Sequence, residues 1–231
     1  MKMIQCNQLV VGYNQPLTEP FNLDIEENKW LGIIGENGIG KSTFMKTILG
    51  VIEPMSGEIK VFENSAGRDN CLISYIPQER EINVTDRMSG YTLIKSSYMG
   101  WRFGLPIIDR KLNSLALELL DLVGATDYQN QPFNTLSGGQ KKRIYLAQAL
   151  INKPKLLLLD EPLADLDPKA KQHFIEAMQE IHNNQSLGLL IISHDMHEIA
   201  SHLDGFIHFK DKMVHSCIEL PCAKEDTYVG V

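Results

Sequence analysis

Apolar and polar residues at the start of the chain follow patterns typical of strands and a short helix. Residues 21–26 alternate apolar and polar side chains, as a half-buried strand does, and residues 3–11 are rich in β-forming residues. Residues 30–34 form an apolar strand that leads into a glycine-rich loop, and the helical spacing of 43–49 ends at Gly50. This order predicts antiparallel strands, then a strand, a loop and a helix.

The middle of the chain has a helical pattern instead. Between residues 84 and 152, apolar residues recur at helical intervals, and Gly124 supplies a stop signal. We therefore expect a mostly helical lobe at about 85–152. The clearest stripe of this pattern consists of Leu112, Leu115, Ala116, Leu119, Leu120 and Val123.

Strands return in the last part of the chain. Apolar strands are expected at 155–160 and 187–193 with a helix at 168–182 between them, which is typical of a parallel sheet with crossover helices. Short strands follow at 206–214. The whole pattern predicts the α/β fold class: a parallel sheet, an antiparallel β-subdomain and an inserted helical lobe.

Composition and charge narrow the class of protein. The 231 residues contain no internal repeat, so we expect one domain, 1–231, with a core at about 1–84 and 153–231. The net charge of −7, without a block of basic residues, argues against nucleic acid as a partner. No apolar run approaches the roughly 18 residues of a membrane span, and the N-terminus lacks the apolar core of a secretory signal. We therefore expect a cytoplasmic protein.

The glycine-rich loop at 35–42, GENGIGKS, fits the pattern G-x-x-x-x-G-K-[ST] at every fixed position. Its glycines let backbone N–H groups turn toward a polyphosphate, and the following helix adds its positive end. Lys41 would reach the β- and γ-phosphates, and the Ser42 hydroxyl would hold Mg²⁺. An incidental lysine on a glycine-rich turn is the alternative, and the strand and helix on either side argue against it. The residues expected to bind nucleotide here are Gly35, Asn37, Gly38, Gly40, Lys41, Ser42 and Thr43.

Two carboxylates follow the apolar strand at 155–160. Asp160 and Glu161 come at the carboxyl edge of the expected sheet, where open α/β folds bind ligands. Successive side chains of a strand point in opposite directions, so we expect the two acids to have different roles. Asp160 would hold Mg²⁺, and Glu161 would orient or deprotonate the attacking water. Both could instead simply end the strand before a turn at Pro162, but the phosphate-binding loop favours the catalytic interpretation.

Residues 136–140, LSGGQ, predict a second site suited to anionic oxygen. Ser137 and Gln140 have the spacing of a capping box, so we expect a helix to begin near Ser137. Its N-terminus would expose unpaired N–H groups beside Gly138 and Gly139, which permit close approach. Capping alone explains the serine and the glutamine but not the paired glycines. Together the three segments predict a protein that binds and hydrolyses ATP.

These segments resemble the nucleotide-binding subunit of an ATP-binding cassette (ABC) transporter, a family in which LSGGQ lies between the phosphate-binding loop and the strand that carries the acids. The resemblance covers nearly the whole chain and implies the fold of a P-loop NTPase with a RecA-like core. It implies that Tyr13 stacks on adenine, and that Gln78 contacts Mg²⁺ and links the core to the helical lobe. It also implies that His194 acts at the γ-phosphate.

The resemblance also implies partners. Two copies would pair head to tail as a homodimer, so that each ATP lies between the phosphate-binding loop of one copy and residues 137–140 of the other. ATP would close the dimer, hydrolysis at Glu161 would reopen it, and the motion would pass to integral membrane permease subunits. The protein would then lie on the cytoplasmic face of the cell membrane.

One segment departs from the family pattern. Asp165 stands where many relatives have alanine or glycine, while Asp167 still matches an acid of that segment. An extra carboxylate near the dimer junction could weaken closure or face solvent. The change therefore bears on communication between the two ATP sites.

Candidate metal ligands have simpler explanations. His194 and His197 have H-x-x-H spacing, but no third ligand is apparent in the sequence. His215, Cys217 and Cys222 could form a regulatory metal sensor, although short strands and a tail explain them without any function. The cysteines form no C-x-x-C pair, which predicts reduced thiols.

Two further groups are interpreted as structural. The basic residues 141–143 are interpreted as the solvated face of a helix. A set of aromatic residues is interpreted as packing of the helical lobe, with a groove for a permease helix as the alternative. The set is Tyr91, Tyr98, Trp101 and Phe103.

Three functions are weighed. The first is an ATPase subunit that energises transport through separate membrane proteins. The second is a soluble mechanochemical cassette ATPase of DNA repair or ribosome rescue, which would bring coiled coils, paired cassettes or basic surfaces. The third is a regulatory module without turnover. The intact candidate residues argue against it, namely Lys41, Asp160, Glu161 and His194. Residues 98–104 and 161–164 resemble ATPases of zinc, manganese or iron importers, while amino-acid, lipid and drug transport stay open.

Overall fold

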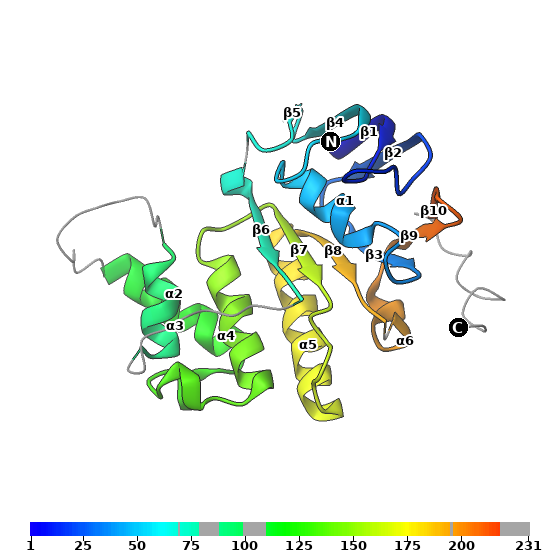
Figure 1. The fold of residues 1–231 in the computed structure, drawn as a ribbon. Coiled ribbons are helices and arrows are strands. Elements are labelled where there is room, and N and C mark those ends of the chain that lie inside the picture. Colours follow the sequence, from blue (N-terminus) through cyan, green and yellow to red (C-terminus); the bar gives the residue numbers. More distant parts are fainter. Residues whose placement is uncertain (69, 79–87, 99–109, 195, 218–231) are drawn as a thin grey trace.

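The computed structural model describes residues 1–68, 70–78, 88–98, 110–194 and 196–217 of the chain. Figure 1 shows one β-sheet near the N-terminus, another through the middle of the molecule, and helices between and beside them. Among the residues described, no helix is both long and apolar enough to cross a bilayer.

The sheet near the N-terminus is antiparallel, with the strand order β2-β1-β4-β5. β2 buries every second side chain, which confirms the alternation expected at 21–26. Its strands are β1 (Lys2–Val10), β2 (Phe21–Glu26), β4 (Ser56–Val61) and β5 (Asn64–Ser65).

The central sheet has the strand order β10-β9-β3-β8-β7-β6. All of its pairs are parallel except β9–β10, which is antiparallel. β7 and β8 bury every residue, as expected for parallel strands that are covered on both faces. The strands are β3 (Trp30–Gly35), β6 (Ile73–Ile76), β7 (Leu156–Asp160), β8 (Gly188–Ile192), β9 (Gly205–Lys210) and β10 (Met213–Cys217).

The helices occupy two regions. α1 lies between the two sheets, whereas α2, α3 and α4 pack together beside the central sheet and α5 runs along it (Figure 1). The limits 85–152 for a helical lobe stay our proposal. The α-helices are α1 (Lys41–Ile48), α2 (Gly90–Ser96), α3 (Arg110–Leu122), α4 (Gly138–Leu150), α5 (Pro168–Gln185) and α6 (Met196–Ile199). Short 3₁₀ turns are η1 (Asn70–Leu72), η2 (Thr126–Tyr128), η3 (Phe133–Thr135) and η4 (Ala200–His202).

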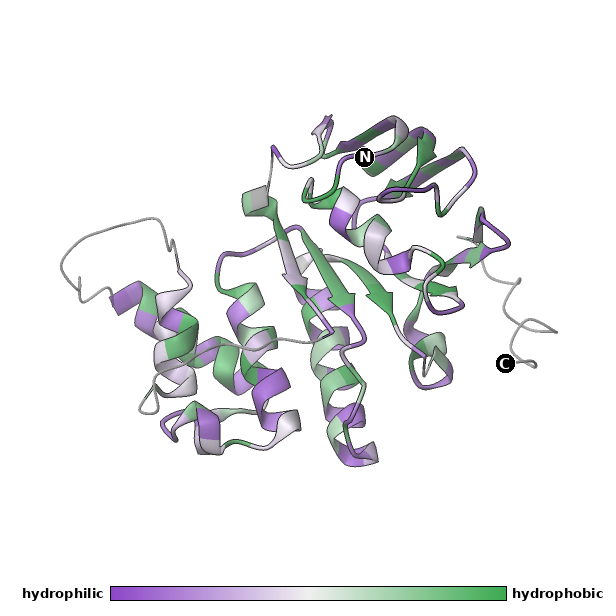
Figure 2. Ribbon diagram, viewed as in Figure 1, coloured by the Kyte–Doolittle hydropathy of each residue, from purple (hydrophilic) through white to green (hydrophobic). Residues whose placement is uncertain are grey.

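The central sheet separates two hydrophobic clusters. Successive side chains of a strand point to opposite faces, so Leu157 of β7 joins a cluster with α2 to α5, whereas Leu158 joins one with α1 and the antiparallel sheet. β3 divides in the same way, with Trp30 in the first cluster and Leu31 in the second. The central strands are therefore apolar on both faces (Figure 2).

Phe44 of α1 joins the two sheets. Its side chain is fully buried, and its ring centroid lies 5.9 Å from that of Phe21 on β2 and 5.8 Å from that of Phe209 on β9. The contact with Phe21 is edge-to-face, an arrangement that stabilises beyond simple burial. Phe44 therefore fixes the helix that follows the glycine-rich loop against both sheets.

Replacing Phe44 with alanine is expected to lower the free energy of unfolding by about 3–5 kcal/mol, because it removes a fully buried ring and leaves a cavity. Denaturant unfolding of the purified protein measures the change. Leu117→Ala on α3 is the control, since Leu117 is 47% exposed and its loss should stay within about 0.5 kcal/mol. Equal losses in the two variants would contradict the role given to Phe44.

Candidate active site

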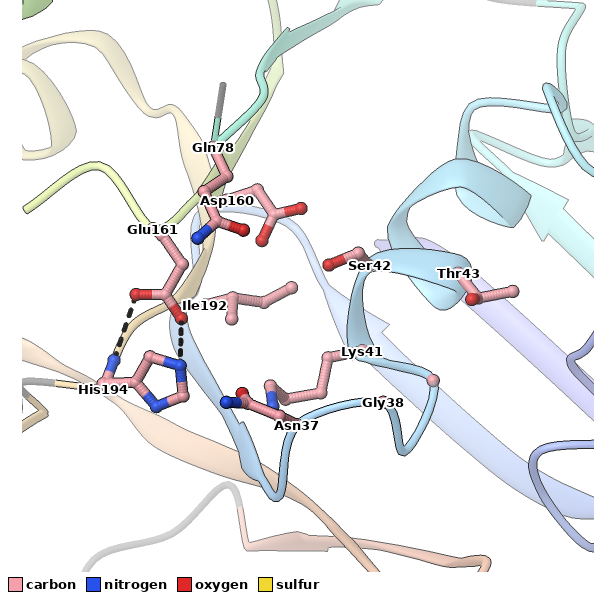
Figure 3. Close-up of a pocket in the computed structure, with 11 residues that line it drawn as sticks. Asn37, Gly38, Lys41, Ser42, Thr43, Gln78, Asp160, Glu161, Ile192 and His194 are labelled. Carbon is pink, nitrogen blue, oxygen red and sulfur yellow. Dashed lines mark hydrogen bonds and ion pairs between the residues drawn. The ribbon is translucent and has the colours of Figure 1, made fainter. Parts of the chain in front are cut away.

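The carboxyl ends of β3, β8 and β7 meet at one edge of the central sheet, opposite the N-terminus of α1. A cavity of about 320 Å³ lies at this edge, and the residues drawn in Figure 3 line it. Nearly all of its lining residues were predicted from the sequence, Ile192 being the exception. They are Asn37, Gly38, Gly40, Lys41, Ser42, Thr43, Gln78, Asp160, Glu161, Ile192 and His194.

The glycine-rich loop has the backbone that glycine permits. Gly38 has a φ of 78°, and Gly35 has a φ of 147°. A Cβ atom at Gly35 would lie only 2.4 Å from the carbonyl oxygen of Phe209, so the neighbouring strand β9 also requires a glycine there. The sequence therefore folds this segment as a tight turn between β3 and α1.

Lys41 lies within the loop that precedes it. Its Nζ donates hydrogen bonds to the carbonyl oxygens of Gly35 at 2.6 Å and Glu36 at 2.8 Å. Burial lowers the pKa of Lys41, while the nearby carboxylates of Glu161 and Asp160 act to raise it. The Lys41 ammonium therefore brings a positive charge to the cavity, which Asp160 and Glu161 also line.

Asp160 has a partner that the sequence analysis did not find. The Tyr75 hydroxyl on β6 donates a hydrogen bond to Asp160 Oδ2 at 3.2 Å. Burial raises the pKa of Tyr75, and the charge of Asp160 raises it further. The signal in the sequence was that Tyr75 lies three residues before Gln78, a residue expected at the site. The structure adds that its strand pairs with β7.

Glu161 points into the same cavity as Asp160. The strand ends at Asp160 and Glu161 has a left-handed backbone with φ 52°, so the alternation of a strand does not extend to Glu161. The backbone N–H of Glu161 still donates to the Ile192 carbonyl oxygen at 2.9 Å, which holds it beside β8. A change of backbone conformation over one residue therefore brings both carboxylates to one site.

His194 holds the Glu161 carboxylate from two sides. The His194 backbone N–H donates to Glu161 Oε2 at 3.2 Å, and His194 Nε2 lies 3.2 Å from Oε1. Burial raises the pKa of Glu161, and the His194 ring and N–H oppose that rise. The side chain of Glu161 is 7% exposed, whereas that of His194 is 57% exposed, so the imidazole lies at the mouth of the cavity.

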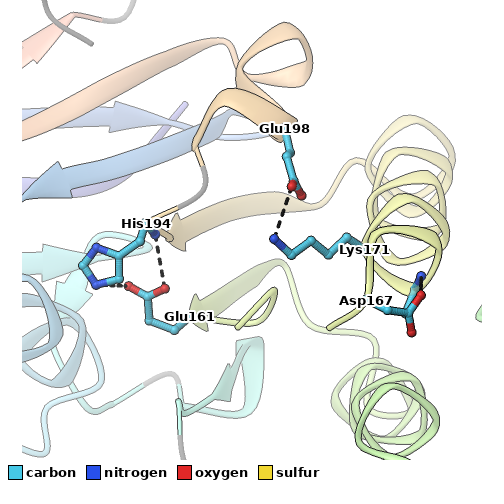
Figure 4. A network of polar contacts seen from close by, with 6 residues as sticks. Glu161, Asp167, Lys171, His194 and Glu198 are labelled. Atoms are coloured by element: carbon cyan, nitrogen blue, oxygen red, sulfur yellow. Dashed lines mark hydrogen bonds and ion pairs between the residues drawn. The ribbon is translucent and has the colours of Figure 1, made fainter. Parts of the chain in front are cut away.

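The elements that carry this pair are tied together nearby. Figure 4 shows Lys171 of α5 reaching Glu198 of α6, with 3.2 Å between Nζ and Oε1. Asp167 caps the start of α5 by accepting a hydrogen bond from the Ala170 N–H at 3.0 Å. The segments that follow β7 and β8 are therefore fixed to each other through α5 and α6.

The LSGGQ segment forms the capping box predicted for it. The Ser137 N–H donates to Gln140 Oε1 at 2.9 Å, and the Gln140 N–H donates to Ser137 Oγ at 3.3 Å, at the start of α4. Residues 137–140 do not line the cavity, and neither do Tyr13 and Gly35. Tyr13 is 59% exposed. The structure therefore does not bring these predicted residues to the cavity of the same copy.

The basic residues after LSGGQ are not a solvated face, so that expectation was wrong. Lys141, Lys142 and Arg143 are all half-buried. Arg143 Nη1 donates to the Gly124 carbonyl oxygen at 3.2 Å, and Nη2 lies 2.9 Å from His173 Nδ1. Helix α4 packs against α5 along this side, which turns charged residues into packing residues.

The remaining candidates are the suggested metal ligands and the aromatic residues of the lobe. In the part of the chain that the structure covers, no group of three or more His, Cys, Asp or Glu side chains could hold a metal ion. Cys222, which belongs to the suggested metal sensor, lies outside the described residues. Tyr91 and Tyr98 pack against the core cluster, as expected for the lobe. Trp101 and Phe103 lie outside the described residues.

Comparison with known proteins identifies the family. The family model described as ABC transporter matches residues 18–164. The chain belongs to the ABC transporter family. One relative is the manganese transport system ATP-binding protein MntA of Synechocystis sp., which is 31% identical over 208 residues covering 88% of this chain and 80% of that protein. Another is the high-affinity zinc uptake system ATP-binding protein ZnuC of Bacillus subtilis, with 29% identity over 91% of this chain and 92% of that protein.

Solved structures of this family share the fold. The structure of cbiO1 from Clostridium perfringens, part of the ABC transporter complex cbiONQ, has a TM-score of 0.81 and 25% identity, covering 93% of this chain and 87% of that chain. A dimeric ATP-binding cassette bound to ADP and Pi has a TM-score of 0.79 and 22% identity, covering 94% of this chain and 98% of that chain. The predicted fold class, a P-loop NTPase core, is confirmed.

Membership of the ABC transporter family also gives the activity. The chain is an ATP-binding subunit that hydrolyses ATP and so energises transport through membrane permease subunits. ABC ATPase domains of this kind work as dimers. The cavity at the edge of the central sheet is the candidate site for ATP hydrolysis.

Proposed function

We propose that two copies of the chain bind ATP head to tail, each nucleotide lying between residues 35–43 of one copy and 137–140 of the other. The observation that carries this proposal is that the two expected phosphate-binding segments are both formed but do not meet within one copy. A Cβ atom at Gly138 would have no neighbour within 4 Å among the described residues, so the start of α4 is open to a ligand. A second copy would complete each site.

In this proposal the phosphates are bound by the loop and by Lys41. Backbone N–H groups of a glycine-rich loop and the start of α1 provide donors and a positive end for the oxygens. Lys41 exchanges its carbonyl partners for the β- and γ-phosphates. Tyr13, which is exposed, stacks on the adenine ring.

The cavity also suits Mg²⁺. The oxygens of Ser42, Gln78 and Asp160 line it, and hydroxyl, amide and carboxylate oxygens are ligands that this hard cation prefers. Bound there, the ion would neutralise charge on the phosphates. The Tyr75 hydroxyl would orient the Asp160 carboxylate from behind.

Glu161 is proposed as the group that accepts a proton from the attacking water. Burial raises its pKa toward the range in which a general base works best, and its bonds to His194 fix the carboxylate at the cavity mouth. His194 is exposed on its other side, where it can reach the γ-phosphate. Gln78, two residues after the end of β6, lines the same cavity (Figure 3).

For cargo, we propose a divalent metal ion such as manganese or zinc. The support is that the relatives MntA and ZnuC, which align with nearly the whole chain, are named for manganese transport and zinc uptake. The protein would be peripheral, on the cytoplasmic face of the cell membrane, bound to integral permease subunits.

Glu161→Gln is expected to keep ATP affinity but to lower turnover by about 100-fold or more, because the amide cannot accept a proton. It should also trap a closed dimer, seen as an ATP-dependent shift in size-exclusion chromatography. Glu180→Gln on the exposed side of α5 is the matched control and should behave as the wild type. Near-normal hydrolysis by Glu161→Gln would rule out Glu161 as the base.

Tyr75→Phe is expected to weaken divalent-ion binding roughly 10-fold, since it removes the hydroxyl that orients Asp160. Electron paramagnetic resonance of Mn²⁺ bound with ATP measures this directly, and calorimetry without metal should show unchanged ATP affinity. Tyr91→Phe is the control, because its hydroxyl bonds Asn113 in the helical lobe. Unchanged Mn²⁺ binding by Tyr75→Phe would contradict the proposed role.

A tagged chain purified from membranes of its own host is expected to bring a polytopic membrane protein with it. Cells that lack the chain should lose uptake of radioactive manganese or zinc, and the wild type but not Lys41→Ala should restore it. Uptake that does not change would exclude metal cargo. A chain that stays wholly soluble and brings down no membrane protein would contradict the proposed location on the membrane.

A further inference from the structure

The turn after Glu161 begins and ends with a residue in the left-handed backbone region. Glu161 and Asp165 both have left-handed φ angles, of 52° and 60°, which cost energy for residues other than glycine. Between them the Ala164 N–H donates to the Glu161 carbonyl oxygen at 3.3 Å. Leu163 is fully buried and anchors the turn in the core. The position of the Glu161 carboxylate therefore depends on this turn staying in place.

Helix α4 packs directly on this turn. The Lys142 Nζ donates a hydrogen bond to the Ala164 carbonyl oxygen. One turn earlier on α4, a Cβ atom at Gly139 would lie 3.5 Å from Leu166 Cδ2 and 3.3 Å from Ala170 Cβ, so the helix approaches closely at that point. Within the same copy, the helix that begins with LSGGQ thus contacts the segment that carries Glu161, the proposed catalytic base.

The charges around Lys142 fit this contact. Burial lowers the pKa of Lys142, and the carboxylates of Asp165 and Glu161 raise it. Asp165 is the acid that departs from the family pattern, and it lies on the same turn as the Ala164 carbonyl. A half-buried ammonium is therefore held between a backbone acceptor and the negative charge of this turn.

We propose that Lys142 is a positioning residue for ATP hydrolysis, whose bond to the Ala164 carbonyl holds the turn that places Glu161. The proposal rests on the proposed role of Glu161 as the base. Lys142 lies five residues after Ser137, in the helix whose start would bind the nucleotide of the partner copy. Lys142 therefore also connects that helix to Glu161, which would act on the nucleotide bound by its own copy. Lys142 touches neither nucleotide in this arrangement.

The test compares Lys142→Met, Lys142→Arg and the control Lys141→Met in steady-state ATPase assays of the full chain. Lys142→Met should lower kcat about tenfold, because a small displacement of a catalytic group is costly. Its KM and its calorimetric ATP affinity should stay within about twofold, since the phosphate-binding loop is untouched. Lys142→Arg, which keeps the charge and a donor, should keep kcat within about threefold of the wild type. Lys141→Met should match the wild type.

Several results would overturn this role. An unchanged kcat for Lys142→Met, an equal loss in Lys142→Arg, or an equal loss in Lys141→Met would each do so. So would a rise in KM with a fall in thermal stability, which would indicate a merely structural contact. Failure of the proposed function looks different, because there Glu161→Gln would hydrolyse ATP at the wild-type rate whatever stands at position 142.

Discussion

The parallel order of β3, β8 and β7 is the constraint on which the site depends. Parallel strands bring their carboxyl ends to one edge, so Lys41, Asp160 and His194 meet although they are far apart in the sequence. Hydrophobic burial on both faces of the sheet holds that order. The charged groups gather at the edge because there the apolar strands end. Stability and chemistry therefore occupy the same sheet but different parts of it.

Within the site, local strain replaces regular structure. Glu161 leaves the strand with a left-handed backbone, and that departure turns its carboxylate toward Lys41 and His194. Burial would disfavour its charge, and His194, followed by Lys41, offsets part of that cost. Helix α4 supports the strained turn from outside through Lys142. The acid is thus held by contacts that lie outside the cavity itself.

Sequence reasoning found the elements and most of the site because both depend on local patterns. The alternation in β2, the glycine-rich loop and the capping box at Ser137 each follow from a few neighbouring residues. It missed what depends on neighbours distant in the sequence. The Tyr75 bond to Asp160 needs the pairing of β6 with β7, and the burial of Lys142 needs the packing of α4 on the turn. The left-handed backbone of Glu161 was also missed, because alternation holds only while a strand continues.

The bonds of Lys41 to its own loop have a further consequence for affinity. The ammonium has Gly35 and Glu36 as acceptors, so an arriving triphosphate must compete with two short hydrogen bonds. The net gain in binding free energy is then the difference between Lys41 bonded to phosphate and Lys41 bonded to its own loop. That difference is smaller than the strength of either set of bonds. In the proposed exchange the lysine regains these partners as ADP departs, which lowers the affinity for the product. A loop built this way limits how tightly the nucleotide is retained.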